Sequence, residues 1–464
     1  MTHVWTTCRA AAALNLLGAG LSGCASYSAR PVDLHAHRAA WAERTPESPD
    51  VRLLAEELSK ASGEPVSLDL ADGLSAAEAE LVALVYNPEL RVARLRAGVA
   101  RATADNAGRW EDPVLGGEVT RFLQSTANPW MLATTLGLTL PVSGRLGIER
   151  QRAGAEHATA ITRVFEQEWT VRNELRRAWA RWSAAEQKAR VTREYLASLE
   201  GLVGIVDRLE QAGELPTIDA RFFKIEHSMR RNELVQMEAM RREAELMVRQ
   251  VMGLSPGAPV TLLPGLSPDV DASLSPEHLL ERSPALAVAQ AEYEVAEKSL
   301  ELEVRRQYPD LMVGPGYGRE EGMDQAIGMF QLPLPLWNRN REGVARAEAE
   351  REVARAMLET TLERVESQLA QARVSYEAAL ARRETLEREI VPLVDEQFAA
   401  SRRVAELGEV NTLSLLEAVS RQQEVRMALI EAKLEEWLAA IRVSELTGPA
   451  AAAHPSGTAK EAQQ

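Results

Sequence analysis

The sequence is poor in cysteine, in aromatic residues and in long apolar runs. Its 464 residues include two cysteines, and aromatic side chains make up 5% of them. No run of about 18 apolar residues follows Cys24, so the mature chain offers no candidate for a membrane-spanning helix. An excess of basic charge is also missing. The net charge is −15, which argues against a nucleic-acid partner.

Recognisable catalytic and metal-binding patterns are missing as well. The histidines after the N-terminal region are scattered, and no HExxH motif or Cys–His cluster occurs. Carboxylates are abundant, yet no pair of them is singled out for acid–base work. The sequence therefore predicts no catalytic residues, no resident metal and no cofactor. What remains is a chain rich in Ala, Glu, Arg and Leu with 26% charged residues, which favours long helices.

The N-terminus carries a recognisable export signal. Arg9 gives a positive start, AAALNLLGAGL supplies a short apolar core, and LSGC (Leu21–Cys24) resembles a bacterial lipobox. This pattern predicts a signal peptide over residues 1–23, with a diacylglycerol and an N-acyl chain on Cys24 that anchor the chain to a membrane. The residue after the lipid-bearing cysteine is Ala25 rather than aspartate, which predicts that the lipoprotein is sorted to the outer membrane. An ordinary signal peptide that contains a cysteine by chance is the alternative.

An internal duplication organises the rest of the chain. Four landmarks recur in the same order, and the spacing between the two copies stays between 194 and 196 residues. The pairs are Pro88 and Pro284, Pro113 and Pro309, Pro141 and Pro335, and Gly213 and Gly408. Chance similarity between two alanine-rich regions would not preserve prolines and glycines in this way. We therefore expect a first repeat over 75–270 and a second over 271–448.

Each repeat contains a long helical hairpin, about 142–252 in the first and about 339–447 in the second. Apolar or small residues alternate at steps of four and three along the outgoing arm, which is the heptad pattern of side-by-side helices. In the first repeat they are Val171, Leu175, Ala178, Trp182, Ala185, Ala189, Thr192, Leu196, Leu199, Val203 and Val206. In the second they are Val365, Leu369, Ala372, Tyr376, Ala379, Arg383, Leu386, Ile390 and Leu393, at an offset of 194.

Two strands are expected ahead of each long hairpin, within about 113–141 and about 309–335. Their apolar side chains recur with the period of two that places them on one face of a strand. The predicted lipid-facing residues are Leu132, Leu136, Leu138, Leu140, Leu311, Val313 and Tyr317. A water-exposed hairpin that covers the end of a helical bundle is the alternative. Because eight strands is the smallest usual membrane barrel, four strands cannot close one, whereas three chains would supply about twelve.

Over residues 75–448 the chain resembles the TolC family of outer-membrane efflux channels. The resemblance rests on NPEL at Asn87–Leu90, on the paired passages from strand through proline to helix, on the duplicated hairpins and on the lipobox. It implies a mainly α protein with a transmembrane β part, which forms a homotrimer with one twelve-stranded β-barrel above a hollow α-barrel. The segment PLPLWNRNREG (Pro333–Gly343) is similar to channels of heavy-metal efflux systems of the RND type, but related channels that export drugs share much of it.

The resemblance also implies partners and a location. The channel would lie in the outer membrane of a Gram-negative bacterium, extend into the periplasm, and work passively with a periplasmic adaptor and an inner-membrane pump. The helical turns at the far end would contact the adaptor through Gly213, Glu214, Leu215, Gly408, Glu409 and Val410. Two other interpretations stay open: a periplasmic adaptor and a structural coiled-coil lipoprotein. Residues 24–74 are expected to form a lipid-anchored N-terminal segment, and 449–464 a disordered tail.

Overall fold

The computed structural model describes residues 27–62, 68–123, 129–266, 279–320, 322–406 and 412–449. Contacts divide the chain into two units, residues 1–44 and residues 45–464. The described part of the first unit contains helix α2 (Leu34–Ala42), whose first turn is capped because the Asp33 side chain accepts hydrogen bonds from the backbone of His35 and Ala36. The predicted lipid attachment site, Cys24, lies outside the described residues.

The second unit consists of helices and a single four-stranded sheet. Its first half contains α3 (Pro49–Ser62), α4 (Ala76–Tyr86), α5 (Pro88–Asn106), β1 (Val114–Arg121), β2 (Trp130–Leu140), α6 (Arg145–Ala212) and α7 (Thr217–Val251). Its second half contains α8 (Leu279–Arg282), α9 (Pro284–Arg305), β3 (Leu311–Glu320), β4 (Met323–Gln331), α10 (Arg341–Thr385), a π-helical turn (Leu386–Ile390), α11 (Val391–Glu406) and α12 (Thr412–Thr447). The mainly α fold with a small β part is therefore confirmed.

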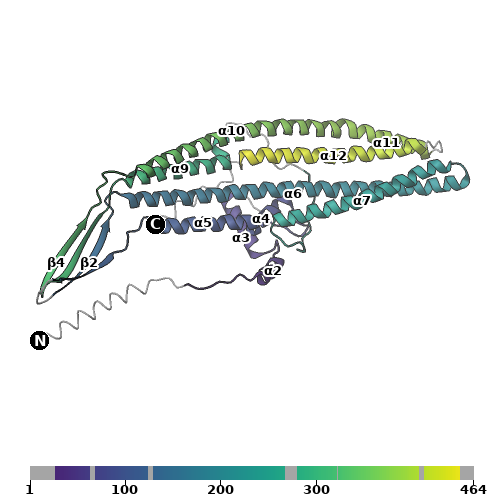
Figure 1. Ribbon diagram of the computed structural model, residues 1–464. Coiled ribbons are helices and arrows are strands. Elements are labelled where there is room, and N and C mark those ends of the chain that lie inside the picture. Colours follow the sequence, from purple (N-terminus) through teal and green to yellow (C-terminus); the bar gives the residue numbers. More distant parts are fainter. Residues whose placement is uncertain are drawn as a thin grey trace. The chain divides into compact units, whose positions relative to one another are not determined.

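The longest helix, α6, has 68 residues and extends for about 100 Å. In Figure 1 the strands lie beyond one end of the long helices of the second unit, and the turn between α6 and α7 lies at the opposite end. Across the described residues, no helix is both long enough and apolar enough to cross a membrane.

The two halves close in the same way, which gives the duplication a structural basis. Asn87 caps α5 by accepting hydrogen bonds from the backbone of Glu89 and Leu90, and its Nδ2 donates to the carbonyl of Val251 at the end of α7 at 2.9 Å. The residue that ends each return helix is a glycine with positive φ, Gly253 at 74° and Gly448 at 81°. Either glycine lies so close to a backbone carbonyl that an added Cβ would stand 2.1 Å from it.

The predicted heptad positions of the first repeat form the main core. Every one of them is buried or half-buried in α6, and Leu175 at 1% exposure packs in the largest apolar cluster beside Trp179 and Ile441. Thr192, a polar member, is fully buried and its hydroxyl contacts Sδ of Met237 at 3.1 Å. The cluster also includes Val51 and Ala55 of α3, in a segment whose packing the sequence did not predict.

In the second repeat the predicted heptad positions are buried or half-buried only as far as Ile390, and the next one, Leu393, is 65% exposed. The cause is the π-helical turn, in which the Val391 N–H donates to the carbonyl of Leu386, five residues back. One extra residue in a turn shifts the phase of everything that follows by about 100°. Past the turn the seam continues at Val394 and Phe398, and Phe398 packs against Tyr195, Leu199 and Val419.

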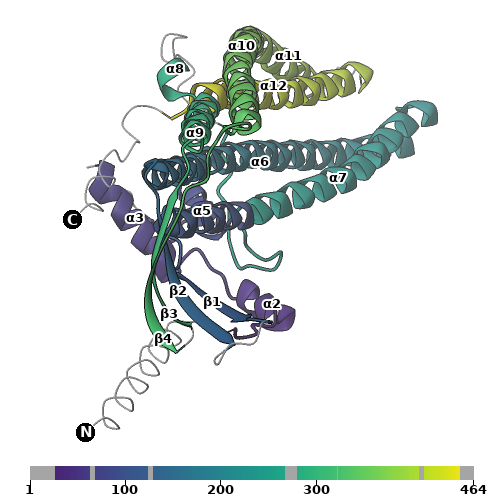
Figure 2. The ribbon, with the colours of Figure 1, turned by 60° about the vertical axis from the view of Figure 1, so that its left-hand side comes forward.

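The four strands form one antiparallel sheet in the order β1-β2-β3-β4. Both predicted strand intervals contain a hairpin, and the two hairpins join through β2 and β3 (Figure 2). The partner strand of β3 covers Met323–Gln331, so Leu332 lies just beyond it. The register sets Leu138 opposite Val313, which aligns the side chains of the two repeats.

Candidate membrane sheet and its junction with the helices

One face of the sheet is apolar and exposed in the single chain. Strand register and alternation place eleven large apolar residues on this apolar face: Leu115, Val119, Trp130, Leu132, Leu136, Leu138, Leu140, Leu311, Val313, Tyr317 and Phe330. The same face also carries Thr134 and, toward the end of the sheet away from the helices, Arg121, Arg319 and Asp324. All seven residues predicted to face lipid are among the eleven apolar ones. Several of them are strongly exposed, at 56% for Leu132, 57% for Tyr317 and 80% for Phe330, whereas Leu140, Leu311 and Val313 are half-buried.

The opposite face, here called the small face, is built mainly from glycine, alanine, threonine and methionine. Ala133, Gly137, Gly314 and Gly318 on it are buried. The strands approach one another closely here, because a Cβ on Gly314 would stand 2.5 Å from the carbonyl oxygen of Leu136. Large apolar side chains are thus exposed along this sheet, the reverse of the arrangement in a water-soluble protein.

The sheet has two open edges. In the strand order of the described residues, β1 and β4 each pair with one neighbour only. An exposed edge carries a row of unpaired N–H and C=O groups, which pair with another chain or stay in water. In a hydrocarbon environment each unpaired group would cost several kcal/mol.

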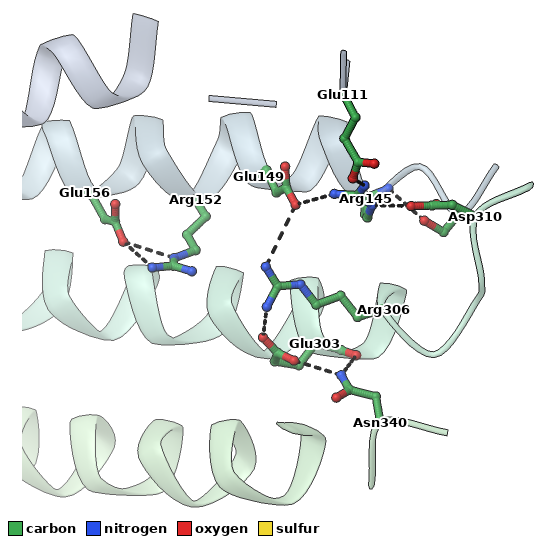
Figure 3. A network of polar contacts seen from close by, with 10 residues as sticks. Glu111, Arg145, Glu149, Arg152, Glu156, Glu303, Arg306, Asp310 and Asn340 are labelled. Carbon is green, nitrogen blue, oxygen red and sulfur yellow. Dashed lines mark hydrogen bonds and ion pairs between the residues drawn. The ribbon is translucent and has the colours of Figure 1, made fainter. Parts of the chain in front are cut away.

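A polar network holds the end of the sheet nearest the helices (Figure 3). Arg145, the first residue of α6, binds three carboxylates: Asp310 at 2.8 Å, Glu111 at 2.7 Å and Glu149 at 3.1 Å. Glu111 precedes β1 and Asp310 precedes β3, so one guanidinium joins the connectors of both repeats. Arg145 and Asp310 are only 17% and 19% exposed.

The network continues to the second long arm. Arg306, at the end of α9, lies between Glu149 and Glu303, and Asn340 donates from Nδ2 to the Glu303 carboxylate and carbonyl, each at 2.8 Å. Burial disfavours the charge of Arg145, but the hydrogen bonds that its guanidinium donates to Asp310 and Glu111 outweigh this effect and raise its pKa. All four passages between helix and strand are therefore tied together by charge-assisted hydrogen bonds.

Each long helix is entered through a residue in the left-handed backbone region. Gly144, with φ of 71°, precedes α6, and Asn340, with φ of 52°, precedes α10. Glycine and asparagine are the residues that adopt this conformation at least cost. The chain passes from strand to long helix around Pro141 and Pro335, as the two proline landmarks predicted, and it turns at Gly144 and Asn340. Arg145 was not predicted from the sequence, although the charged residues that flank the repeated prolines were a usable signal.

The opposite end of the first hairpin is a tight turn. Gly213 ends α6 with φ of 74°, and the N–H of Glu214 donates to the carbonyl of Leu209 at 2.9 Å. Gly213 and Glu214 are exposed, whereas Leu215 packs partly against Phe223. The corresponding predicted tip, Gly408–Val410, lies outside the described residues. Throughout the described parts of the chain, no group of three His, Cys, Asp or Glu side chains is arranged to hold a metal ion.

The sequence profile of the outer membrane efflux protein family matches residues 82–254 and 275–449. These two blocks correspond to the two repeats and together cover most of the chain. The chain therefore belongs to the outer membrane efflux protein family. Membership removes the two other interpretations, a periplasmic adaptor and a structural coiled-coil lipoprotein.

One sequence relative and two solved structures are similar to the chain. The chain is 27% identical over 173 residues to the cobalt-zinc-cadmium resistance protein CzcC of Cupriavidus metallidurans, a match that spans 36% of this chain and 41% of that protein. The fold is similar to the solved structure of CusC, with a TM-score of 0.69 at 15% identity over 81% of this chain and 92% of that one. It is also similar to the outer membrane protein VceC of Vibrio cholerae, with a TM-score of 0.66 at 17% identity over 80% and 96% of the two chains.

Proposed function

We propose that this outer membrane efflux protein is the passive exit duct of a tripartite pump and works as a homotrimer. The observation that carries the proposal is the open sheet with its apolar face exposed, placed at the end of two long hairpins. Three copies supply twelve strands, which close the two edges and turn the apolar faces toward lipid. The small faces then line the pore, where water forms hydrogen bonds with the threonine hydroxyls.

The helices extend this pore into the periplasm. A helix of about 100 Å is far longer than a globular core requires, and its heptad seam lets neighbouring helices pack along that whole length. The exposed turn at Gly213 and Glu214, with its counterpart at Gly408–Val410, then lies farthest from the membrane and meets a periplasmic adaptor. The protein is a conduit rather than an enzyme, because the energy for transport comes from the inner-membrane pump.

A lipid on Cys24 would fix the N-terminus in the same membrane as the barrel. The acyl chains would anchor the protein in addition to the barrel, because each methylene group buried in the bilayer contributes about 0.8 kcal/mol of binding free energy. The protein would thus be an outer-membrane lipoprotein.

The cargo is a metal ion or a drug. Metal ions are favoured by the similarity to a protein that is named for cobalt, zinc and cadmium resistance. Profiling a deletion strain against these metals, dyes and bile salts tests the cargo. Sensitivity to metals alone supports metal export, and sensitivity to dyes and bile salts alone supports drug export.

The channel itself is tested on the purified protein. We expect a trimer that requires detergent and that changes its gel mobility on heating, as closed membrane barrels do. A monomer that stays soluble after the detergent is removed would contradict the channel, since its apolar strands would then be stable in water.

A further inference from the structure

The methionines of the sheet lie on one face. The four strands hold four of the chain's 12 methionines, and register and alternation place all four on the small face: Met131 in β2, Met312 in β3, and Met323 and Met329 in β4. In these strands the apolar face carries leucine and valine instead. Contact with lipid therefore does not account for the methionines, whose distinguishing group is a soft, polarisable thioether sulfur.

Two of these methionines meet over a pair of glycines. Gly137 of β2 and Gly314 of β3 are neighbours, since a Cβ on Gly314 would stand 3.3 Å from Cα of Gly137. A Cβ on Gly137 would stand 3.3 Å from Sδ of Met312 and 3.5 Å from Cε of Met329. Met329 lies opposite Gly314 in the register, so its side chain crosses that glycine to reach Gly137. Two thioether groups from different strands therefore end over the same point.

The surroundings of this pair are uncharged. Met312 lies between Thr139 and Gln331 in the register, and Gly137 lies opposite Val114. Both methionines are half-buried, so their sulfurs are supported by the strands and remain accessible from the small face. The pair thus offers two neutral sulfur ligands on a floor of glycine.

This set of ligands suits one chemical class of ion. Thioether sulfur selects soft ions such as Cu(I), whereas zinc is bound by thiolate, imidazole or carboxylate. Soft monovalent ions also accept low coordination numbers, so a pair of thioethers is enough to hold one. Because both ligands are neutral, the ion keeps its charge and is held weakly, which lets it leave again as conduction requires.

We propose that Met312 and Met329 form a transient binding site for a soft monovalent metal ion, Cu(I) or Ag(I), on the wall of the pore. The inference rests on the proposed function, in which the small faces line the exit duct, and it specifies the cargo as a soft metal cation. Both ligands come from one chain, so each copy carries a complete site.

Silver binding to the purified full-length protein in detergent tests the site. Free thiols are first blocked with N-ethylmaleimide, so that neither Cys8 nor Cys24 takes up silver, and equilibrium dialysis against Ag(I) in chloride-free buffer is followed by metal analysis. Met312→Leu with Met329→Leu should lower the affinity about tenfold or more, and each single substitution should lower it as well. Leucine keeps the volume of methionine, so the fold should be unchanged.

Met131→Leu with Met323→Leu is the matched control. These residues lie on the same face but do not converge, because Met323 is opposite Glu320 of β3 and Met131 belongs to β2. Silver binding should be retained in this variant. Zn(II) in the same dialysis should not distinguish either variant from the native protein.

X-ray absorption at the silver edge of the loaded native protein keeps the test independent of any variant, and it should show sulfur neighbours. Equal silver binding by the native trimer and by Met312→Leu with Met329→Leu, or silver with only nitrogen and oxygen neighbours, overturns this site and leaves the proposed channel intact. A monomer that stays soluble without detergent overturns the channel, and with it the placement of this site in a pore.

Discussion

The Nε of Arg145 donates a hydrogen bond of 2.8 Å to Oδ2 of Asp310, and this contact joins the start of α6 to the start of β3. The two residues come from different repeats, and Arg145 also holds Glu111 and Glu149. A single side chain thus fixes how both hairpins leave the helices. Its removal would leave three carboxylates close together without their shared counter-charge.

Arg145→Ala should therefore lower the free energy of unfolding by about 2–3 kcal/mol, the cost of unpairing part-buried charges. Thermal unfolding in detergent measures the effect. Arg152→Ala is the matched control, because Arg152 pairs only along its own helix, with Glu156, and should cost at most about 0.5 kcal/mol. Equal losses in the two variants would show that the network does not position the sheet.

Substitutions on the two faces of β2 should have opposite consequences. Leu136→Arg puts a charge on the apolar face and should cost about 2–4 kcal/mol if that face meets lipid, which prevents insertion into the outer membrane. Thr135→Arg, one residue earlier on the small face, should insert, because its charge reaches water. Fractionation of the two variants measures this. Normal insertion of Leu136→Arg would be evidence against a lipid-facing surface.

Acid should weaken the second hairpin through Glu387. Hydrogen bonds from Lys433 and Arg383 lower the pKa of this carboxyl below 4.5, so its contribution to stability is full above about pH 4.5 and is lost as the pH falls through the folded-state pKa. Thermal unfolding of Glu387→Gln should differ from the native protein at pH 7 and converge with it at lower pH. Glu348→Gln, an exposed change on α10, is the control. A gap that stays constant with pH would contradict this role.

Charge reversal at the tips should weaken the adaptor contact alone. With Glu214→Lys and Glu409→Lys combined, adaptor pull-down should fall and efflux-dependent resistance should drop, because the exposed Glu214 lies on the turn and makes no core contact. Glu200→Lys, on the exposed side of α6, should retain the pull-down. Trimer yield should not change in either variant. Unaltered resistance and pull-down would exclude docking at the tips.

Cys24→Ser should abolish palmitate labelling, because the thiol is the proposed site of the diacylglycerol. Metabolic labelling followed by gel autoradiography measures it. Cys8→Ser is the control, since Cys8 falls within the expected signal peptide and should not affect labelling. Persistent label on Cys24→Ser would place the lipid elsewhere.

Much of the fold could be predicted from the sequence because two periodicities are strong. Alternation at Leu136 and Leu138 predicted a strand, and the heptad through Val171 and Leu175 predicted the seam of α6. The exposed position of Leu393 does not follow when the heptad is carried over at a fixed offset of 194, because the π-helical turn contains one extra residue. The change of offset from 194 at Pro141 and Pro335 to 195 at Gly213 and Gly408 was the signal that could have shown it. The role of α3 was also missed, since its apolar residues Val51 and Ala55 acquire a core only from distant helices.

The candidate membrane sheet and its junction also have a part that could be predicted from the sequence and a part that could not. The period of two was enough to assign the apolar face, but Arg145 and Asp310 are 165 residues apart and come together through the pairing of β2 with β3 and the packing of α6 on α9. Their partnership is a property of the fold, and no local pattern encodes it.

The π-helical turn in the second arm also accounts for the one residue by which the two arms differ in length. The repeats are offset by 194 residues before it and by 195 after it, as Leu369 with Leu175 and Phe398 with Val203 illustrate. Had the extra residue been added to a regular helix, every later side chain would have rotated away from its neighbour. Because the backbone bulges there instead, the later part of the arm stays in phase with the first arm, and deleting one residue from 386–390 should restore an ordinary α-helix without loss of fit.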